Sequence, residues 1–184
     1  LDNLRIIQKR NSISLSESLE DFHFSIEMET GTGKTYVYLR TIFALNQKYG
    51  FSKFIIVVPS IAIKEGVIKN LEITKDHFEL LYKTKVDFFL YDPKKLSDIR
   101  SFCISNTLQI LIINIDSFAK FDEEKAGLNI MYKDIDKLSG RMPIEFIQKT
   151  NPIVIIDEPQ NMETENRRTA IKNLNPLFTL RYSA

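Results

Sequence analysis

The chain has 184 residues, of which 43% are hydrophobic, and this is enough to bury the core of one domain of ordinary size. Basic and acidic residues nearly balance, at 25 against 24, and the formal net charge is +1. The balance excludes a basic tail or an acidic solvating segment, so any contact with a nucleic acid must come from a local patch.

The lone cysteine, Cys103, excludes an internal disulfide, and no group of side chains has metal-ligand spacing. His23 and His77 are isolated, so we interpret them as ordinary packing or surface residues, and Cys103 as a core residue. No aliphatic run approaches the roughly 20 residues of a membrane helix, and no signal-peptide pattern opens the chain. We therefore expect a reduced, cytoplasmic setting without a membrane partner.

Predicted strands and helices alternate along the chain, with short apolar runs marking the strands. The near-continuous apolar run at residues 54–59 is typical of a strand covered on both faces, and Gly50 is placed to end the preceding helix. The expected strands cover residues 24–28, 54–59, 85–91, 108–115, 153–157 and 179–183. The expected helices cover residues 34–48, 60–71, 143–149 and 163–173. The alternation predicts a three-layer α/β fold around a mostly parallel sheet.

Residues 119–140 are polar and lack clean periodicity, so we expect a mobile insertion there. No repeat or Pro/Gly/Ser-rich linker divides the sequence, and residues 1–184 are expected to form a single domain. The chain begins with Leu1 and ends on Arg181-Tyr182-Ser183-Ala184, directly after a predicted strand, which leads us to expect a fragment of a longer polypeptide.

A glycine-rich segment between the first predicted strand and helix has the context of a phosphate-binding loop. Its glycines allow a tight turn that aims backbone N–H groups at phosphate oxygens, and the helix dipole adds to that field. The lysine would reach the β- and γ-phosphates of ATP, and the last hydroxyl would ligate Mg²⁺. The candidate ATP-binding residues are Glu29, Thr30, Gly31, Thr32, Gly33, Lys34 and Thr35.

Two alternatives to this loop stay open. Met28 stands where the strict pattern has its first glycine, so a chance glycine-rich turn is one of them. A dinucleotide-binding fingerprint is the other, but it would require glycine in place of Tyr36.

The strand at residues 153–157 ends in a pair of acids, Asp157 and Glu158. A strand of an open α/β sheet delivers such residues at its carboxyl end, where ligands bind. Asp157 would hold Mg²⁺, and Glu158 would orient and deprotonate the attacking water. Pro159 biases Glu158 toward an extended conformation and ends the strand. Without a phosphate-binding loop, the same pattern would fit an ordinary exposed strand end.

Four segments resemble the motifs of superfamily-2 helicases, and their combination is most similar to the Res (restriction) subunit of type III restriction enzymes. Met-Glu-Thr-Gly-Thr-Gly-Lys-Thr, at residues 28–35, resembles motif I, and Asp-Glu-Pro-Gln, at residues 157–160, resembles motif II. The stretch at residues 56–67 is similar to motif Ia, and Arg-Tyr-Ser-Ala, at residues 181–184, is similar to the start of motif III. The resemblance spans residues 28–184 and implies a RecA-like P-loop NTPase domain.

The resemblance implies an ATP-dependent DNA translocase motor with DNA contacts outside the ATP site. By resemblance, Ser60 and Lys64 of motif Ia touch the phosphate backbone, and Ser60 is also placed to cap a helix whose free N–H groups accept a phosphate. Ser117 follows another strand, in the place of a further DNA-facing loop. Gln160 departs from the usual His or Asp, and it would couple hydrolysis to motif III through Ser183.

The implied partners are DNA, a second motor domain, a nuclease domain and a modification (methyltransferase) subunit; the nuclease residues themselves are not in this sequence. Other readings remain open: another P-loop ATPase, such as an AAA-type protein, a repair helicase or a small-molecule kinase, or a nucleotide-binding regulatory module without turnover. Glu158 argues against the last of these, because a module without turnover has no use for a general base.

Overall fold

The computed structural model describes residues 1–19, 22–119, 129–136 and 140–184. Its centre is a six-stranded sheet in which every neighbouring pair is parallel, in the order β1-β6-β5-β2-β4-β3. The strands are β1 (His23–Glu27), β2 (Lys53–Val58), β3 (Val86–Leu90), β4 (Leu108–Asn114), β5 (Ile153–Asp157) and β6 (Phe178–Ser183). The predicted strands are confirmed, with ends that shift by one residue, and the predicted parallel α/β fold is confirmed with them.

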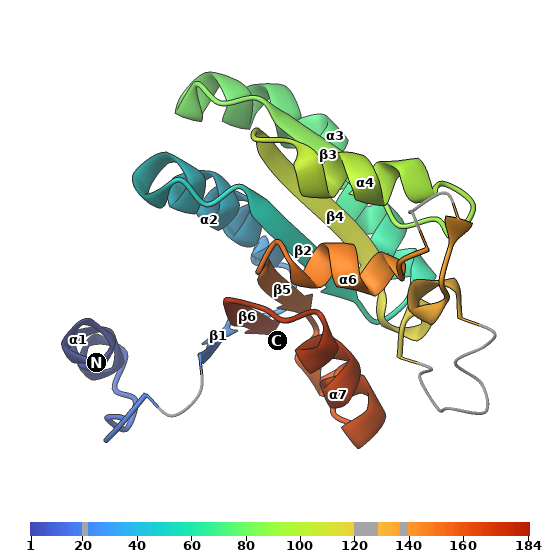
Figure 1. Ribbon diagram of the computed structural model, residues 1–184. Coiled ribbons are helices and arrows are strands. Elements are labelled where there is room, and N and C mark those ends of the chain that lie inside the picture. Colours follow the sequence, from blue (N-terminus) through green and yellow to red (C-terminus); the bar gives the residue numbers. More distant parts are fainter. Residues whose placement is uncertain (20–21, 120–128, 137–139) are drawn as a thin grey trace.

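The middle of the sheet is covered on both faces, which explains the apolar runs in the sequence. Every residue of β4 and β5 is buried, as are residues 54–58 of β2. Helices α2 (Lys34–Tyr49) and α3 (Ile61–Tyr82) cover one face, and α4 (Leu96–Ile104), α6 (Pro143–Gln148) and α7 (Glu165–Asn173) cover the other (Figure 1). A strand buried on both faces has no polar face to show, so its sequence does not alternate.

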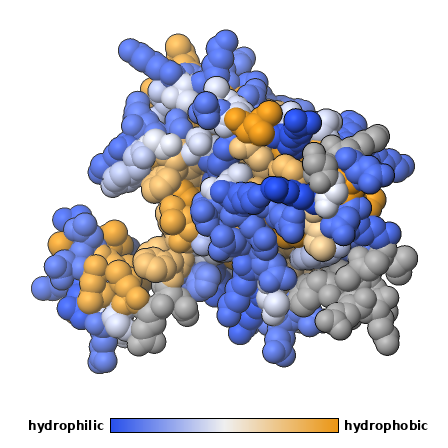
Figure 2. All heavy atoms as spheres, viewed as in Figure 1, coloured by the Kyte–Doolittle hydropathy of each residue, from blue (hydrophilic) through white to orange (hydrophobic). Residues whose placement is uncertain are grey.

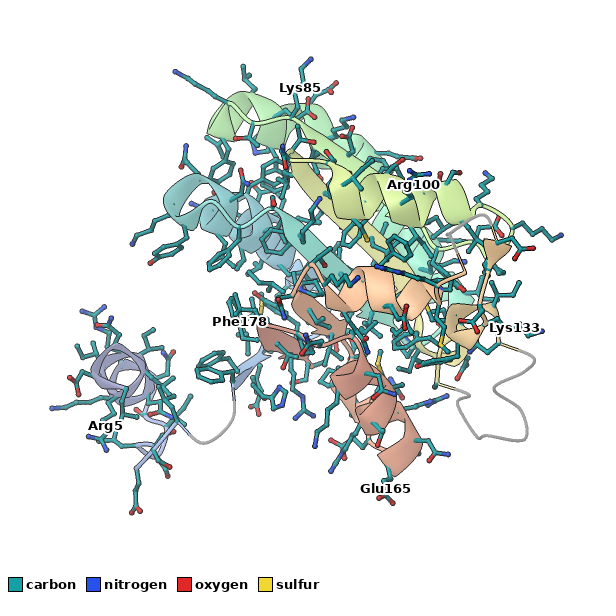
Figure 3. All side chains as sticks on the ribbon, viewed as in Figure 1. Arg5, Lys85, Arg100, Lys133, Glu165 and Phe178 are labelled. Carbon is teal, nitrogen blue, oxygen red and sulfur yellow. The ribbon has the colours of Figure 1, made fainter. Side chains whose placement is uncertain are left out.

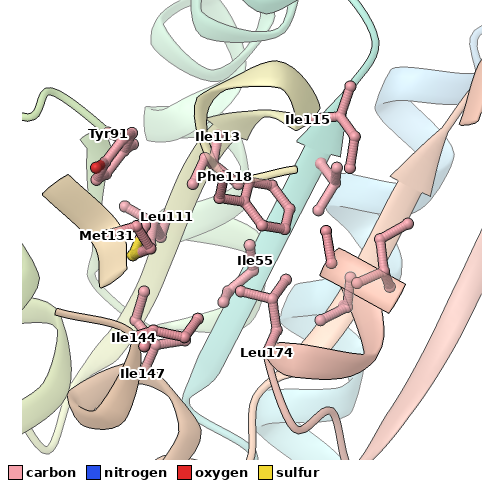
Figure 4. Close-up of a cluster of buried hydrophobic side chains, with 14 of the residues drawn as sticks. Ile55, Tyr91, Leu111, Ile113, Ile115, Phe118, Met131, Ile144, Ile147 and Leu174 are labelled. Carbon is pink, nitrogen blue, oxygen red and sulfur yellow. The ribbon is translucent and has the colours of Figure 1, made fainter. Parts of the chain in front are cut away.

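The two faces carry separate hydrophobic clusters. On the α4–α6–α7 face, Ile55 and Leu111 lie at the centre of a cluster that Phe118 and Leu174 close from the loops (Figure 4). Cys103 packs at its margin, and burial raises the pKa of that thiol to about 12, against the opposing effect of the Lys53 charge. Its interpretation as a core residue is consistent with this position.

Helix α3 is longer than its sequence predicted. It runs from Ile61 to Tyr82, whereas the expected helix ended at residue 71. The additional turns carry Phe78, which is fully buried and stacks on Phe43 of α2 with ring centroids 5.2 Å apart. Exposed apolar residues such as Leu80 obscure the helical period in this stretch, so the sequence pattern did not reveal it.

Part of the segment expected to be a mobile insertion belongs to the core. The short 3₁₀ helix η2 (Ile130–Tyr132) places Met131 in the cluster beside α6, with no exposed surface. The Tyr132 hydroxyl donates to the Phe118 carbonyl at 3.0 Å. The expectation of a mobile insertion is therefore wrong for residues 130–132, because a single buried methionine anchors a stretch that has no periodic pattern. Residues 120–128 and 137–139, which the expectation also covered, lie outside the described part.

An N-terminal helix that the sequence did not predict, α1 (Asp2–Arg10), stands apart from the sheet (Figure 1). It buries none of its residues, and apolar side chains lie exposed on it and on the segment that follows (Figure 2). Arg5 Nε donates to the Ser16 carbonyl at 2.8 Å and ties the helix to that segment. No helix in the described part of the chain is long and apolar enough to cross a membrane.

The stacking of Phe78 between α2 and α3 predicts a large stability effect. We expect Phe78→Ala to lower the free energy of unfolding by about 3–5 kcal/mol, because a buried aromatic ring is replaced by a cavity. Ile73→Ala is the matched control, since Ile73 lies on the same helix and is 70% exposed; it should change stability by less than about 0.5 kcal/mol. Urea denaturation followed by circular dichroism measures both, and equal losses would contradict this account of α3.

Candidate nucleotide-binding site

The loop between β1 and α2 has the backbone of a phosphate cradle. Gly31 and Gly33 have φ of 79° and 89°, a left-handed conformation that glycine adopts without penalty. Nothing lies within 4 Å of a Cβ built on either one, so backbone conformation, and not space, is the reason for glycine here. The Thr32 hydroxyl donates to the Glu29 carbonyl at 2.6 Å and closes the turn.

Helix α2 begins directly after this loop with its first N–H groups uncapped. Its N-cap is Gly33, which offers no side chain, so the N–H groups of the first turn are available to an anion. Lys34 and Thr35 lie in this first turn and are half-buried. The entrance to the loop is fixed by the sheet, since the Met28 N–H donates to the Ser183 carbonyl at 3.0 Å. The structure thus places the expected ATP-binding residues around a helix N-terminus.

The acidic pair lies at the carboxyl end of β5, with Asp157 in the strand and Glu158 just after it. Asp157 is 5% exposed. Glu158 adopts φ 55° and ψ 60°, so the expectation that Pro159 would keep it extended is wrong. Its N–H donates to the Tyr182 carbonyl of β6 at 3.0 Å, and its own carbonyl accepts from the Asn161 N–H at 3.1 Å. These bonds hold a left-handed conformation that costs about 1–3 kcal/mol in a residue with a side chain.

The left-handed turn directs Glu158 toward the phosphate loop, where it forms an ion pair with Lys34. Adjacent residues of a straight strand point to opposite faces, so the turn is what allows both acids to serve one site. Burial alone would raise the pKa of Glu158, but the hydrogen bonds from Lys34 and Gln160 and the Lys34 charge outweigh it, and the net pKa is lowered. Glu158 is therefore ionised at neutral pH.

Gln160 lies beside the acidic pair and binds a different partner from the expected one. Its side-chain amide donates to Glu158 Oε2, and within the described residues no hydrogen bond joins it to Ser183. Ser183 instead contributes its carbonyl to the N–H of Met28. The coupling role of Gln160 and Ser183 stays a prediction.

A buried tyrosine that belongs to none of the expected motifs completes the site. Tyr38 lies one turn into α2, has no exposed surface, and donates from its hydroxyl to Asp157 Oδ2 at 3.4 Å. Burial and the nearby Asp157 charge raise the pKa of the phenol well above its usual value, so the hydroxyl remains a donor. The spacing of Tyr38 from Lys34, one helical turn, was the available signal, because it places both residues on the same side of α2.

Asp157 is held in an environment that disfavours its charge. Burial raises the pKa of its carboxyl, the Glu158 charge raises it further, and Lys34 and Tyr38 oppose the shift. Among the residues that the structure describes, no group of three or more His, Cys, Asp or Glu side chains could hold a metal ion by itself. A hydroxyl and a carboxylate are nevertheless the oxygen donors that Mg²⁺ prefers when nucleotide phosphates supply further ligands, so Thr35 and Asp157 fit such an ion.

The expected DNA-contacting residues lie after two neighbouring strands, β2 and β4. Ser60 is the N-cap of α3, and its hydroxyl accepts from the Ile63 N–H at 3.3 Å, which confirms its capping role. Lys64 lies one turn further along and is half-buried. Ser117 ends the short 3₁₀ helix η1 (Ile115–Ser117) that follows β4. The carboxyl ends of parallel neighbours meet at one edge of a sheet, so these residues and the acidic pair share that edge.

An arginine that the sequence analysis missed connects two of these loops. Arg167 of α7 pairs with Asp116 at 2.8 Å, in the loop that carries Ser117. The same guanidinium donates to the Asn161 carbonyl at 2.6 Å, just after the acidic box. No local pattern marks Arg167, because both of its partners come from other elements.

An all-parallel sheet, a glycine-rich loop opening the helix after β1 and an acidic pair at the end of β5 together define a P-loop domain of the helicase type. The family model described as "Type III restriction enzyme, res subunit" matches residues 2–184, and the chain belongs to this family.

Curated proteins with similar sequences agree with this family. The chain is 30% identical to the type III restriction-modification enzyme EcoP15I Res subunit of Escherichia coli over 207 aligned residues, covering 100% of the chain and 21% of that protein. It is 34% identical to the StyLTI Res subunit of Salmonella typhimurium, covering 88% of the chain and 18% of that protein. The EcoPI Res subunit of Escherichia phage P1 is 29% identical, over 99% of the chain and 20% of that protein. The chain thus spans about a fifth of the length of these relatives.

The raised pKa of Asp157 predicts that its charge costs stability in the absence of ligand. The Asp157 carboxyl binds its proton more tightly in the folded chain than in the unfolded chain. Below about pH 4 the carboxyl is protonated in both states, so the cost is absent. The cost appears as the pH rises through the folded-state pKa, because the buried group then becomes charged. We expect Asp157→Asn to stabilise the chain at pH 7.5 by about 1 kcal/mol, or roughly 2–4 °C in melting temperature. Below about pH 4 the gain should vanish.

Thermal melts in EDTA without nucleotide measure this effect at both pH values. Asp76→Asn is the control, because Asp76 is an exposed carboxylate on α3 and its replacement should change little at either pH. A destabilising Asp157→Asn at pH 7.5 would show that Asp157 supports the fold, in contradiction to the expected cost.

Proposed function

We propose that this chain binds Mg-ATP and is the first motor domain of an ATP-driven DNA translocase in a type III restriction subunit. The observation that carries the proposal is the ion pair between Lys34 and Glu158, residues 124 positions apart. It joins the phosphate loop after β1 to the acidic box after β5. A lysine that binds phosphate and a carboxylate that activates water must both reach the same γ-phosphate, and two side chains in contact meet that requirement.

We further propose an order for nucleotide binding and water activation at the site, based on this ion pair. Without nucleotide, Lys34 neutralises Glu158, so the carboxylate is occupied and its pKa is low. When ATP binds, the γ-phosphate competes for the lysine, and the exchange frees Glu158 to accept a proton from the attacking water. The general base is therefore released by the substrate that it acts on.

Thr35 and Asp157 are the residues that would hold Mg²⁺. An ion held there would supply positive charge against the negative charge that develops on the phosphates during transfer. Gly31 and Gly33 keep the backbone N–H groups of the loop directed at the phosphates. The remaining contribution to hydrolysis is an arginine from a second motor domain, which we place outside this chain; measured arginine fingers contribute about 10³–10⁵ in rate.

We assign DNA backbone contacts to Ser60, Lys64 and Ser117. Basic residues such as Lys85, Arg100 and Lys133 lie on separate parts of the surface (Figure 3), and the net charge is only +1, so binding depends on a local arrangement. The free N–H groups of the first turn of α3 and the Lys64 ammonium supply one. The larger relatives are restriction subunits, and we propose a nuclease domain and a modification subunit as further partners of the whole protein.

Two variants separate nucleotide binding from hydrolysis. We expect Lys34→Ala to weaken Mg-ATP binding by about ten- to a hundredfold, because it removes a charge-assisted contact of roughly 1.5–3 kcal/mol. Glu158→Gln should bind Mg-ATP as tightly as the wild type or more so, because an amide competes less with phosphate for Lys34. In the full-length polypeptide, Glu158→Gln should lose most ATP turnover.

Isothermal titration with Mg-ATP and steady-state phosphate release measure these effects. Lys48→Ala is a suitable control for Lys34→Ala, because Lys48 is an exposed lysine in the last turn of the same helix. Unchanged affinity in Lys34→Ala would refute the phosphate loop, and near-normal turnover in Glu158→Gln would refute the general base.

The DNA assignment predicts a change in salt dependence without a change in sequence preference. We expect Lys64→Ala in the full-length polypeptide to weaken binding to every duplex similarly and to reduce the slope of log K against log salt by about 0.9. Lys69→Ala, at an exposed position further along α3, should leave the slope unchanged. Fluorescence anisotropy over a salt series measures this, and a loss confined to particular sequences would point to base readout instead.

A further inference from the structure

Tyr38 lies between the two residues proposed to hold Mg²⁺, although it belongs to neither motif. Its ring is fully buried on α2, and its hydroxyl has two neighbours. One is Asp157 Oδ2, at 3.4 Å. The other is the Thr35 side chain, one turn earlier on α2, which lies close enough to lower the pKa of the phenol. The phenol thus joins the phosphate-loop helix to the end of β5.

If Thr35 is to hold a cation, the hydroxyl protons of Thr35 and Tyr38 both need acceptors. A threonine hydroxyl that binds a cation uses an oxygen lone pair for the metal, so its proton must be accepted by another atom. With Mg²⁺ held at Thr35, the Tyr38 oxygen would accept that proton, and the Tyr38 hydroxyl donates its own proton to Asp157 Oδ2. The bond of 3.4 Å is long for two oxygens, and contacts of this kind shorten when ligands complete a site.

We propose that Tyr38 is a positioning residue that sets the Thr35 hydroxyl and the Asp157 carboxylate at the spacing and orientation that Mg²⁺ requires. The proposal rests on the proposed function and adds a residue to it. Partners of metal ligands commonly fix the ligand's orientation, and their loss lowers metal affinity about 10–100-fold. Tyr38 should therefore affect the use of Mg²⁺ and leave the metal-free affinity for ATP unchanged.

The chain contains a matched control for the packing of the Tyr38 ring. Tyr182 of β6 is equally buried, and the two rings meet edge to face with centroids 5.6 Å apart. The Tyr182 hydroxyl donates to Thr41 at 3.3 Å, away from the acidic pair. Removing either hydroxyl leaves the same edge-to-face pair of rings, but only the Tyr38 hydroxyl contacts Asp157, a proposed metal ligand.

The experiment compares Tyr38→Phe with Tyr182→Phe in the same chain. ATP affinity is measured by isothermal titration in EDTA and then over a series of Mg²⁺ concentrations. We expect Tyr38→Phe to raise the Mg²⁺ concentration needed for half of the affinity gain by about tenfold, with the affinity in EDTA unchanged. Tyr182→Phe should match the wild type in both measurements, and thermal melts should show both variants folded.

Any other result for these two variants would count against the positioning role of Tyr38 or against the proposed function. Equal shifts in the two variants would assign the effect to ring packing and overturn the proposal, as would a Tyr38→Phe curve that coincides with the wild type. A wild type whose ATP binding ignores Mg²⁺ would refute the proposed function instead. If Tyr38→Phe does not fold, 3-fluorotyrosine at position 38 keeps the hydroxyl. Its ¹⁹F signal should then move when Mg²⁺ joins bound ATP, and an unmoved signal would overturn the proposal.

Discussion

The left-handed turn at Glu158 is the constraint on which the candidate site depends. A strand that continued straight would direct Asp157 and Glu158 to opposite faces of the sheet. The turn directs both toward the phosphate loop, one to Tyr38 and the other to Lys34. Its cost, about 1–3 kcal/mol, is offset by the bond from the Glu158 N–H to β6 and by the 3₁₀ turn of η4 (Pro159–Met162) that follows. Strain of this kind, held by its surroundings, is common at functional sites.

The position of β6 explains why the turn is stable. β6 lies between β1 and β5, so it contacts the loops that follow both strands. Its Tyr182 carbonyl accepts from Glu158, and its Ser183 carbonyl accepts from Met28 at the entrance of the phosphate loop. A shift of β6 would therefore move the acidic box and the phosphate loop together. If the chain binds ATP as proposed, these backbone bonds would give β6 a physical route to sense the nucleotide, independent of the side-chain contact expected from Gln160.

Two groups at the candidate site are unfavourable for the stability of the chain without a ligand. Asp157 is buried with a raised pKa, and the first turn of α2 has no cap. Both features are costs in the ligand-free chain, and both are relieved by a ligand that combines a cation with phosphate oxygens. On the proposed function, the ion pair of Lys34 and Glu158 has a temporary role, since it satisfies two charges that a bound nucleotide would otherwise satisfy. Functional sites often lower stability in this way.

The sequence by itself determined the parallel α/β fold, the phosphate loop and the acidic box, because each depends on short-range chemistry. Glycines at positive φ and apolar runs buried on both faces are properties of a few neighbouring residues. The tertiary structure alone decided the conformation of Glu158, which Pro159 predicts to be extended, and the place of Tyr38 between the motifs. It also decided the last turns of α3, where Phe78 stacks on Phe43 of α2. The reason is that these features depend on partners distant in the chain, such as the Tyr182 carbonyl of β6 that accepts from the Glu158 N–H. A local sequence pattern does not indicate which strand will pair with β5.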